Sequence, residues 1–303
     1  MTLDQLRVFL AVAERCHVTQ AAVTLNMTQS AVSAALSTLE TQHGVKLFDR
    51  IGRGIRLTDV GRSFIDVARG VLLQADIAEL MLSDFSATPR GHLRVQASQT
   101  VATYFLPPFL VRLRQTYPDV SISVGVGNTS SVARAVAEGE ANLGFVEGDV
   151  REGELQRRVI ARDELVLVMR RDHPQAAKAT LSAEDYRSFG WVLREEGSGT
   201  RAEVEAHFAG MGICVENLSI LLEIPSNEAV LSAVASGAYV SMLSHRSVLA
   251  LTADSAILRR RVTWTDRPER PFSVLIHPKR HRSRAALALM AMIDEAPLHE
   301  PCD

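Results

Sequence analysis

The stretch "TQSAVSAALSTLE", residues 28–40, has the spacing of a helix but an unusual exposed face. Val32, Leu36 and Leu39 recur at i, i+4 and i+7, which predicts a buried stripe. The opposite face carries short or uncharged polar side chains: Gln29, Ser30, Ser33 and Ser37. A solvated helix face usually holds Lys, Glu and Arg, which favour both helix formation and solubility. Solvation alone therefore does not explain the composition of this face.

The flanking sequence predicts a small helical domain that ends in a basic hairpin. Apolar spacing predicts helices over residues 3–13 and 19–25, and Gly44 is expected to cap the helix that begins at residue 28. Residues 45–58, "VKLFDRIGRGIRLT", then alternate as a hairpin does and carry three arginines. Two helices, a short turn, a third helix and a basic hairpin together indicate a winged helix-turn-helix over residues 1–58.

The third helix of such a domain enters the DNA major groove. Serines are short enough to let the backbone approach the groove, and the amide of Gln29 can match the donor and acceptor of adenine. Arg53, at the hairpin tip, is expected in the minor groove, and Arg50 and Thr28 are expected on phosphates. The alternative is a small helical domain whose polar helix has no special purpose.

A long helical pattern runs from Thr58, a suitable N-cap, to about residue 87. Its apolar residues fall on two heptad positions: Ala68, Ala75 and Leu82 on one, and Phe64, Val71, Ala78 and Phe85 on the other. This pattern predicts a linker helix over residues 59–88 that pairs with a copy of itself. A helix packed only on its own domain is the alternative. "TPRG", residues 88–91, marks its end.

Residues 91–296 alternate apolar strand patterns with helical ones, which predicts parallel, doubly wound α/β sheets. The number of strands suits two small lobes. Lobe I is expected over about 91–162 and 269–296, and lobe II over about 163–268.

Four predicted strand-to-helix junctions carry small polar residues, where ligands of open α/β sheets usually bind. The junctions are "ASQT" (97–100), "GNTS" (127–130), "REEGSGT" (194–200) and "PSNE" (225–228). The predicted effector-binding residues are Ser98, Gln99, Thr100, Asn128, Thr129, Gly197, Ser198, Thr200 and Asn227. Each polar side chain among them could instead be a simple helix cap. The "GSGT" segment has the composition of an anion cradle, although Glu195 and Glu196 would oppose a buried anion unless they point away.

The overall composition fits a globular protein of several domains. The chain has 303 residues, 22% of them charged, and a net charge of −2. Neither a signal peptide nor an apolar run of membrane-spanning length occurs, so we expect a cytoplasmic protein with no membrane partner. Three widely spaced cysteines indicate neither a disulfide framework nor a zinc site, and we expect no cofactor or metal.

An enzymatic function has little support in the sequence. The nine histidines do not fall at the spacing of a catalytic triad, and no Walker loop or complete G-x-G-x-x-G follows the first strand of the α/β part. An enzyme or a plain solute-binding protein built on the two lobes is the alternative. Cys214 is expected to be buried as a small hydrophobe, which makes redox sensing through it the weaker hypothesis.

Residues 9–61, "FLAVAERCHVTQAAVTLNMTQSAVSAALSTLETQHGVKLFDRIGRGIRLTDVG", resemble the N-terminal domain of LysR-type transcriptional regulators. The chain length, the linker helix and the two-lobed C-terminal part fit the same family. The resemblance implies a winged helix-turn-helix, a dimerising linker helix and a two-lobed effector domain like periplasmic binding proteins. Its base-reading positions fall on Gln29, Ser30 and Ser33, with Arg53 on the wing and Arg50 near the DNA backbone.

The resemblance also implies partners. They are double-stranded promoter DNA, a small-molecule effector and further copies of the chain, in a dimer and then a tetramer, with RNA polymerase as a candidate. Residues around "GSGTR" resemble members of the carbon-fixation and sulfur-assimilation branch, which implies a small anionic metabolite. The sequence departs at His17-Val18-Thr19, where many members have a glycine-serine-phenylalanine-type run. That difference concerns the packing of the second helix more than contact with DNA.

Overall fold

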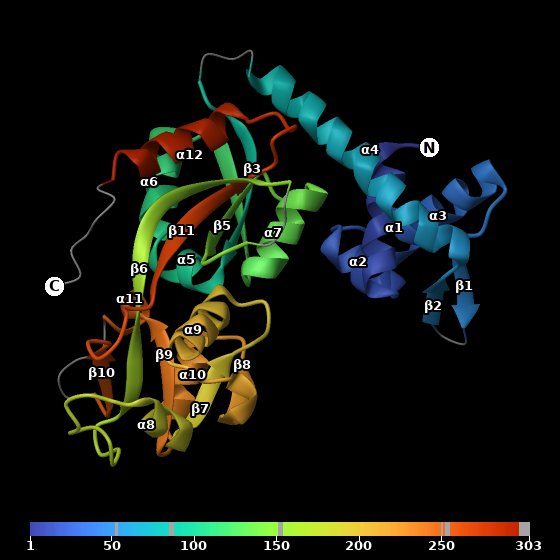
Figure 1. Ribbon diagram of the computed structural model, residues 1–303. Helices are drawn as coiled ribbons and strands as arrows, with labels where there is room; N and C mark the ends of the chain where they lie inside the picture. Colours follow the sequence, from blue (N-terminus) through green and yellow to red (C-terminus); the bar gives the residue numbers. More distant parts are fainter. Residues whose placement is uncertain (52–53, 85–87, 151–153, 250, 252–254, 297–303) are drawn as a thin grey trace. The chain divides into compact units, whose positions relative to one another are not determined.

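The computed structural model describes residues 1–51, 54–84, 88–150, 154–249, 251 and 255–296 (Figure 1). The chain forms two compact units, Met1–Leu82 and Ser83–Asp303. The described elements of the first are α1 (Leu3–Arg15), α2 (Val18–Thr24), α3 (Gln29–His43), the antiparallel pair β1 (Phe48–Ile51) and β2 (Gly54–Leu57), and α4 (Asp59–Asp84), which extends into the second.

The first unit has one core in which the three helices meet the hairpin. Val32, Leu36 and Leu39 of α3 are buried, as their spacing predicted. The ring of Phe9 lies 5.7 Å from that of Phe48 and 5.1 Å from that of Phe64, so α1 joins the hairpin to α4. Gly44 ends α3 in the left-handed conformation, which confirms the predicted C-cap.

The helix α4 is packed near its start and carries exposed apolar side chains farther along. Thr58 accepts a hydrogen bond from the Gly61 amide at 2.9 Å, which confirms the predicted N-cap. Ala68 is buried and Phe64 packs partly buried on the core of the first unit, so the first half of the helix packs on its own domain. Large apolar side chains elsewhere on the helix are exposed: Val67, Val71, Met81 and Leu82. Pairing of α4 with a copy of itself stays a prediction, and Phe85 lies outside the described residues.

The second unit contains the two lobes, whose elements follow here in chain order. They are β3 (Gly91–Ser98), α5 (Gln99–Tyr104), α6 (Pro107–Thr116), β4 (Val120–Gly127), α7 (Thr129–Glu138), β5 (Leu143–Glu147), β6 (Gln156–Arg170), α8 (Ala183–Ser188), β7 (Gly190–Arg194), α9 (Gly199–Gly210), a 3-10 turn (Val215–Asn217), β8 (Ser219–Ile224), α10 (Asn227–Ala235), β9 (Tyr239–Ser244), α11 (His245–Val248), β10 (Ile257–Arg261), β11 (Glu269–Ile276) and α12 (Arg284–Asp294).

The strands of both lobes join in the order β4-β3-β5-β11-β6-β9-β7-β8, with β10 also on β6. In lobe I, β3 is parallel to β4 and β5, and in lobe II β7 is parallel to β8 and β9. The long strand β6 is antiparallel to β11, β9 and β10, and β11 is antiparallel to β5 (Figure 1). The sheets predicted as parallel are parallel within each lobe and antiparallel at β6 and β11, because these two strands carry the chain from one lobe to the other without a crossover helix.

Each lobe has its own core. Phe145 and Phe272 are fully buried in lobe I, and Tyr186, Trp191 and Phe208 are fully buried in lobe II. In lobe I, α5 and α6 are separate helices, because Pro107 begins α6 as a first-turn residue and cannot continue α5.

Two further observations concern the surface of the chain. Cys214 is exposed just before the 3-10 turn, so the prediction that it is buried is wrong. Among the described residues no helix is long and apolar enough to cross a membrane.

Candidate functional site

The polar face of α3 begins at its N-terminus. The Thr28 hydroxyl accepts a hydrogen bond from the Ala31 amide at 3.2 Å and lies 3.0 Å from the Ser30 hydroxyl. Gln29 donates from Nε2 to the hydroxyl of Ser33 at 3.2 Å. Thr28, Gln29 and Ser30 are exposed, and Ser33 is half-buried. The first turn of α3 thus presents short polar groups whose bonds lie along the helix surface.

The hairpin beside α3 is held by one carboxylate. Glu40 Oε1 accepts hydrogen bonds from the amides of Leu47 and Phe48 at 2.7 and 3.2 Å, and Oε2 accepts one from Lys46 Nζ at 2.9 Å. Burial raises the pKa of Glu40, but the bonds from Lys46, Leu47 and Phe48 outweigh it and lower the pKa overall. Glu40, which the sequence did not single out, therefore fixes the hairpin to the end of α3.

The hairpin presents arginine side chains to solvent. Arg50 on β1 and Arg56 on β2 are exposed, and Arg56 lies opposite Asp49 in the strand register. Arg53, predicted at the tip, lies outside the described residues.

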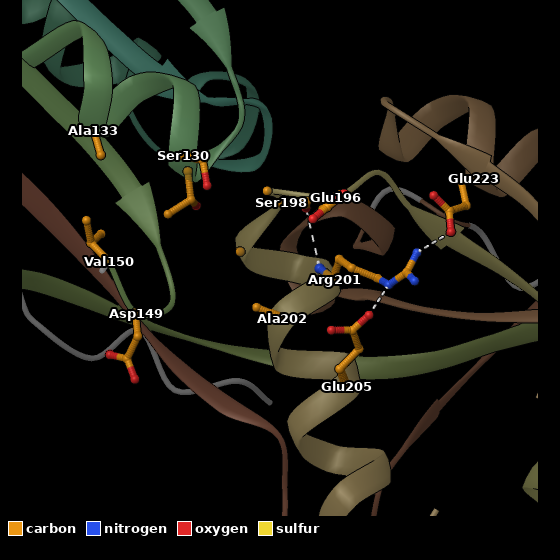
Figure 2. A pocket seen from close by; sticks show the side chains of 13 residues that line it. Ser130, Ala133, Asp149, Val150, Glu196, Ser198, Arg201, Ala202, Glu205 and Glu223 are labelled. Atoms are coloured by element: carbon orange, nitrogen blue, oxygen red, sulfur yellow. Dashed lines mark hydrogen bonds and ion pairs between the residues drawn. The ribbon is translucent and has the colours of Figure 1, made fainter. Parts of the chain in front are cut away.

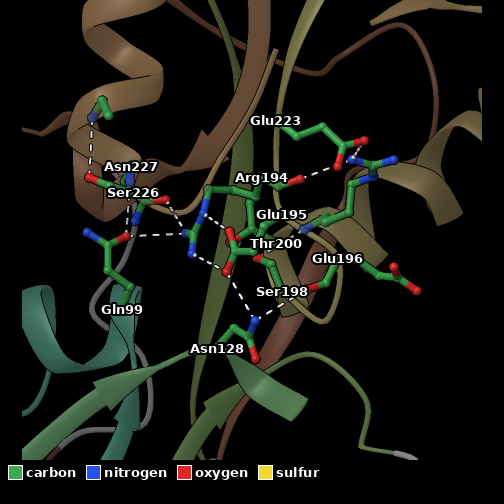
Figure 3. A network of polar contacts seen from close by, with 12 residues as sticks. Gln99, Asn128, Arg194, Glu195, Glu196, Ser198, Thr200, Glu223, Ser226 and Asn227 are labelled. Atoms are coloured by element: carbon green, nitrogen blue, oxygen red, sulfur yellow. Dashed lines mark hydrogen bonds and ion pairs between the residues drawn. The ribbon is translucent and has the colours of Figure 1, made fainter. Parts of the chain in front are cut away.

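The polar junctions of the second unit meet along the seam between the lobes (Figure 3). Asn128 caps α7 and Ser198 caps α9, so both act as helix caps. Asn128 also donates from Nδ2 across the seam, to Glu195 Oε1 at 3.2 Å and to the Glu196 carbonyl at 3.3 Å. The capping role and the interlobe role therefore coexist in one side chain.

A buried ionic centre lies beneath this seam. Arg270 is fully buried, and its Nε donates to Asp163 Oδ2 at 2.9 Å while Nη1 donates to the Thr200 hydroxyl at 2.8 Å. Its Nη1 is also 3.8 Å from Glu147 Oε1. Ser98 donates to the carboxylate of Glu147. Two carboxylates and one guanidinium therefore share a site closed to solvent.

One predicted residue, Thr129, and one that was not predicted, Gly199, join this centre to α7 and α9. The Thr129 hydroxyl donates to the backbone carbonyl of Glu147 at 2.9 Å. Gly199 passes so close that an added Cβ would lie 2.1 Å from that same carbonyl oxygen. Glycine at 199 is therefore explained by the close approach of α9 to β5.

Arg194, at the end of β7, is the charged residue of the seam itself. Its side chain is 2% exposed, and Nη1 donates to Asn227 Oδ1 at 2.7 Å and to Gln99 Oε1 at 3.2 Å. Nε and Nη2 donate to the two carboxylate oxygens of Glu195 at 2.9 and 3.2 Å. Asn227 in turn donates to the Thr100 hydroxyl at 3.1 Å. Arg194 thus binds groups from both lobes (Figure 3).

A second contact between the lobes, the Glu228 clasp, consists of Glu228, Gln99 and Tyr104. Glu228 accepts from Gln99 Nε2 at 2.6 Å and from the Tyr104 hydroxyl at 2.7 Å. Burial would raise the pKa of Glu228, but bonds from Tyr104, its own amide, Ser226 and Gln99 lower it overall. Burial and the Glu228 carboxylate raise the pKa of Tyr104, which keeps its hydroxyl a donor.

A cavity of about 700 Å³ opens beside this network (Figure 2). Among the predicted residues, Thr129, Gly197 and Ser198 line it. The charged residues that line the cavity are Asp149, Glu196, Arg201, Glu205 and Glu223. Arg201 pairs with Glu205 and, at 3.0 Å, with Glu223. The cavity therefore has an acidic rim around one neutralised arginine.

The chain bends sharply where the lobes meet. Gly197 has a φ of +83°, and its carbonyl accepts a hydrogen bond from the Ser130 amide of the opposite lobe at 3.1 Å. An added Cβ there would lie 3.2 Å from Ser130 and 3.3 Å from Asn128. The "GSGT" glycines are thus explained by the close approach of the lobes.

Four buried charged residues of the seam and of the centre beneath it were not predicted from the sequence: Arg194, Glu147, Asp163 and Arg270. Arg194 begins the "REEGSGT" junction, in which only the small residues were predicted to bind the effector. Glu147 ends the apolar strand "LGFVE", and Arg270 stands in "ERPFSVLI". A lone charge at the end of an apolar strand was the available signal. In the part of the chain that the structure describes, no three His, Cys, Asp or Glu side chains form a metal-binding group.

Comparisons with known proteins agree with this architecture. Residues 3–62 match the model of the bacterial regulatory helix-turn-helix protein, lysR family, and residues 86–297 match the LysR substrate binding domain. The chain is similar to an HTH-type transcriptional regulator of Escherichia coli, YeiE, with 36% identity over 249 residues and 82% of each chain covered.

Two solved structures share the fold. Full-length CbnR, solved with its target DNA, has a TM-score of 0.69 at 21% identity and covers 97% of this chain and 99% of its own. The CcmR regulatory domain of Synechocystis PCC6803, solved in complex with 2-PG, has a TM-score of 0.61 at 26% identity, over 68% of this chain and 96% of its own. From the matched family models and the YeiE likeness, the chain belongs to the LysR family of DNA-binding transcriptional regulators and carries an effector-binding domain in its C-terminal part.

Proposed function

We propose that this regulator reads one promoter sequence through the first turn of α3 and responds to a small anionic metabolite held between its lobes. The observation that carries the effector half of the proposal is the buried guanidinium of Arg194, which bonds to Gln99 of one lobe and to Asn227 of the other. A cation placed where two lobes meet gives an anion differential affinity for the closed state.

The DNA half rests on the exposed face of α3. Gln29, Ser30 and Ser33 offer donors and acceptors at the end of the helix that enters the groove in winged helix-turn-helix proteins. Arg50 stands exposed on the hairpin, where it fits a phosphate contact. We assign base reading to these three side chains, backbone contact to Thr28 and Arg50, and minor-groove contact to Arg53.

The effector site is assigned to the seam and the cavity beside it. A volume of about 700 Å³ falls in the range of small-molecule sites. The carboxylates on the cavity rim repel an anion, so its acidic group belongs at Arg194, while the remainder of the molecule extends toward Ser198 and Thr129. The likeness to CcmR, solved with 2-PG, supports an anionic effector.

Assembly of copies completes the proposal. The exposed apolar side chains of α4, Val67, Val71 and Leu82 among them, suit a helix that pairs with a second copy and sets the spacing of two half-sites. Two such dimers would form a tetramer whose DNA contacts and access for RNA polymerase change when the lobes move.

The test is a titration of full-length protein with the DNA upstream of its own gene and with a scrambled DNA, at two salt concentrations. Specific binding that weakens steeply with salt is expected, because phosphate contacts release counterions. Equal affinity for both DNAs would reject sequence-specific reading of this region, and absence of DNA binding at low salt would reject the function.

A further inference from the structure

Arg194 already holds a carboxylate, and the carboxylate comes from its own neighbour. Nε and Nη2 face the two oxygens of Glu195 at 2.9 and 3.2 Å. A two-point contact of this kind is the geometry with which arginine recognises a free carboxylate or phosphate. The pair is close to closed off from water, with 2% of the Arg194 side chain and 24% of the Glu195 side chain exposed.

The Glu195 carboxylate sits among the residues predicted to bind the effector. Its Oε1 accepts from Asn128 Nδ2 at 3.2 Å, so it connects lobe I to the guanidinium of lobe II. Figure 3 shows it between Asn128 on one side and Arg194 on the other. A side chain of the protein therefore fills the position and makes the contacts that suit an external anion.

The neighbouring glutamate behaves differently. Glu196 is exposed, and its side chain points away from Arg194 (Figure 3). Of the two acidic residues that precede the "GSGT" segment, one points away from the anion position and the other occupies it. Burial of a guanidinium without a counter-charge is costly, so a pairing anion is needed in the free protein.

On the basis of the proposed function, we propose that Glu195 is a tethered competitor for the effector. In the free protein it neutralises Arg194 and links the lobes, and an effector with a carboxylate or another oxyanion must displace it. Binding then replaces the Glu195 carboxylate with the effector's anionic group at the same guanidinium. The measured affinity therefore reflects the difference between the free energies with which these two anions bind Arg194. A tethered competitor reduces apparent affinity by the fraction of molecules in which Arg194 is free.

The test uses full-length protein and sodium sulfate as the probe, titrated by calorimetry at constant ionic strength set with sodium chloride. Glu195→Gln removes the competing charge and is expected to bind sulfate at least about tenfold more tightly than the unchanged protein. Glu196→Gln, the matched control, removes the same charge one residue along and is expected to change the affinity less than about twofold, because its carboxylate is exposed and screened.

Two more variants separate displacement from simple charge repulsion. Glu195→Asp keeps the charge but shortens the side chain, so it should also bind sulfate more tightly. The double change Arg194→Gln with Glu195→Gln should lose the gain. Equal effects of Glu195→Gln and Glu196→Gln would overturn the proposal, as would an unchanged affinity in Glu195→Gln or Glu195→Asp.

The outcome is independent of the DNA assay. Sulfate affinity is measured without DNA, whereas the proposed function is judged by promoter binding of the unchanged protein. Absence of promoter binding in the unchanged protein would reject the proposed reading of the promoter and would not affect the sulfate result. Equal sulfate affinities of the unchanged protein and Glu195→Gln would reject the role of Glu195 as a competitor and would not affect promoter binding.

Discussion

The polar face of α3 and the seam between the lobes hold side chains of the same kind in opposite states. Thr28, Gln29 and Ser30 are exposed, and their bonds run along one helix surface. Ser98, Thr200 and Asn227 are buried and bonded to charged groups from distant parts of the chain. The polar side chains of a DNA-binding surface can be solvated in the free protein, because the DNA approaches that surface from outside. The polar groups of a buried small-molecule site need hydrogen-bond partners from the protein when the ligand is absent, because burial of unpaired polar groups costs free energy.

The largest effect is expected where the seam depends on one cation. Arg270→Met leaves Glu147 and Asp163 buried without the charge that faces them, and should destabilise the second unit by about 3–5 kcal/mol. Both tryptophans of the chain, Trp191 and Trp264, lie in lobe II, so urea unfolding followed by tryptophan fluorescence reports this unit. Arg267→Met, at an exposed position, is the control. A loss below about 1 kcal/mol would mean that the two carboxylates find another partner.

A smaller effect is expected where the hairpin is fixed to α3. Glu40→Ala leaves the amides of Leu47 and Phe48 without their acceptor, which should cost about 2 kcal/mol locally. Hydrogen–deuterium exchange at these two amides should accelerate, while Glu14→Ala, an exposed control, leaves them unchanged. If the amides of Glu40→Ala exchange as slowly as before, the hairpin does not depend on this carboxylate.

The α3 face is tested by its own pair of changes. Gln29→Ala should reduce the preference for promoter DNA over scrambled DNA by about tenfold, because one bidentate base contact is lost. Arg50→Ala should weaken binding to both DNAs alike, because a phosphate contact carries no sequence information. Fluorescence anisotropy titrations with both DNAs measure the two effects, and equal loss from Gln29→Ala on both DNAs would remove it from base reading.

The smallest effect concerns acid and the Glu228 clasp. Because the contacts of Glu228 lower its pKa below the ordinary value of 4.5, the clasp stabilises the folded form above that value and loses this contribution as the pH falls through the lowered pKa. The urea midpoint of the second unit should therefore drop between pH 5 and pH 3. In Glu228→Gln the drop should be smaller, and an identical drop would assign it to other carboxylates.

Periodicity identified the elements that have one buried face. Val32, Leu36 and Leu39 predicted α3, and the Thr58 and Gly44 caps were confirmed, because such signals are local. Strand direction was not predictable in the same way. The apolar stretches of β6 and β11 look alike whichever way these strands pair, and nothing local distinguishes a parallel from an antiparallel neighbour.

In the candidate site too, residues with a local sequence signal were predicted, and their partners from distant parts of the chain were not. The small polar residues of the seam were found because they lie at predictable strand ends. Their partners were not, because Arg270 is more than a hundred residues from the Asp163 that it binds. Arg194 and Glu195 are adjacent in sequence, yet their pairing follows from the bend at Gly197 and from Asn128 on the other lobe. A salt bridge between sequence neighbours has no periodicity to reveal it.

The shared strand β6 sets the mechanics of the sensor. Its pairing passes from β11 to β9 between Glu164 and Leu165, so the lobes are joined by a continuous hydrogen-bonded ribbon at that point. A hydrogen-bonded strand of this kind bends elastically and does not rotate freely as an unstructured linker would. Any change in the angle between the lobes therefore has to bend or twist the backbone of β6 at this point.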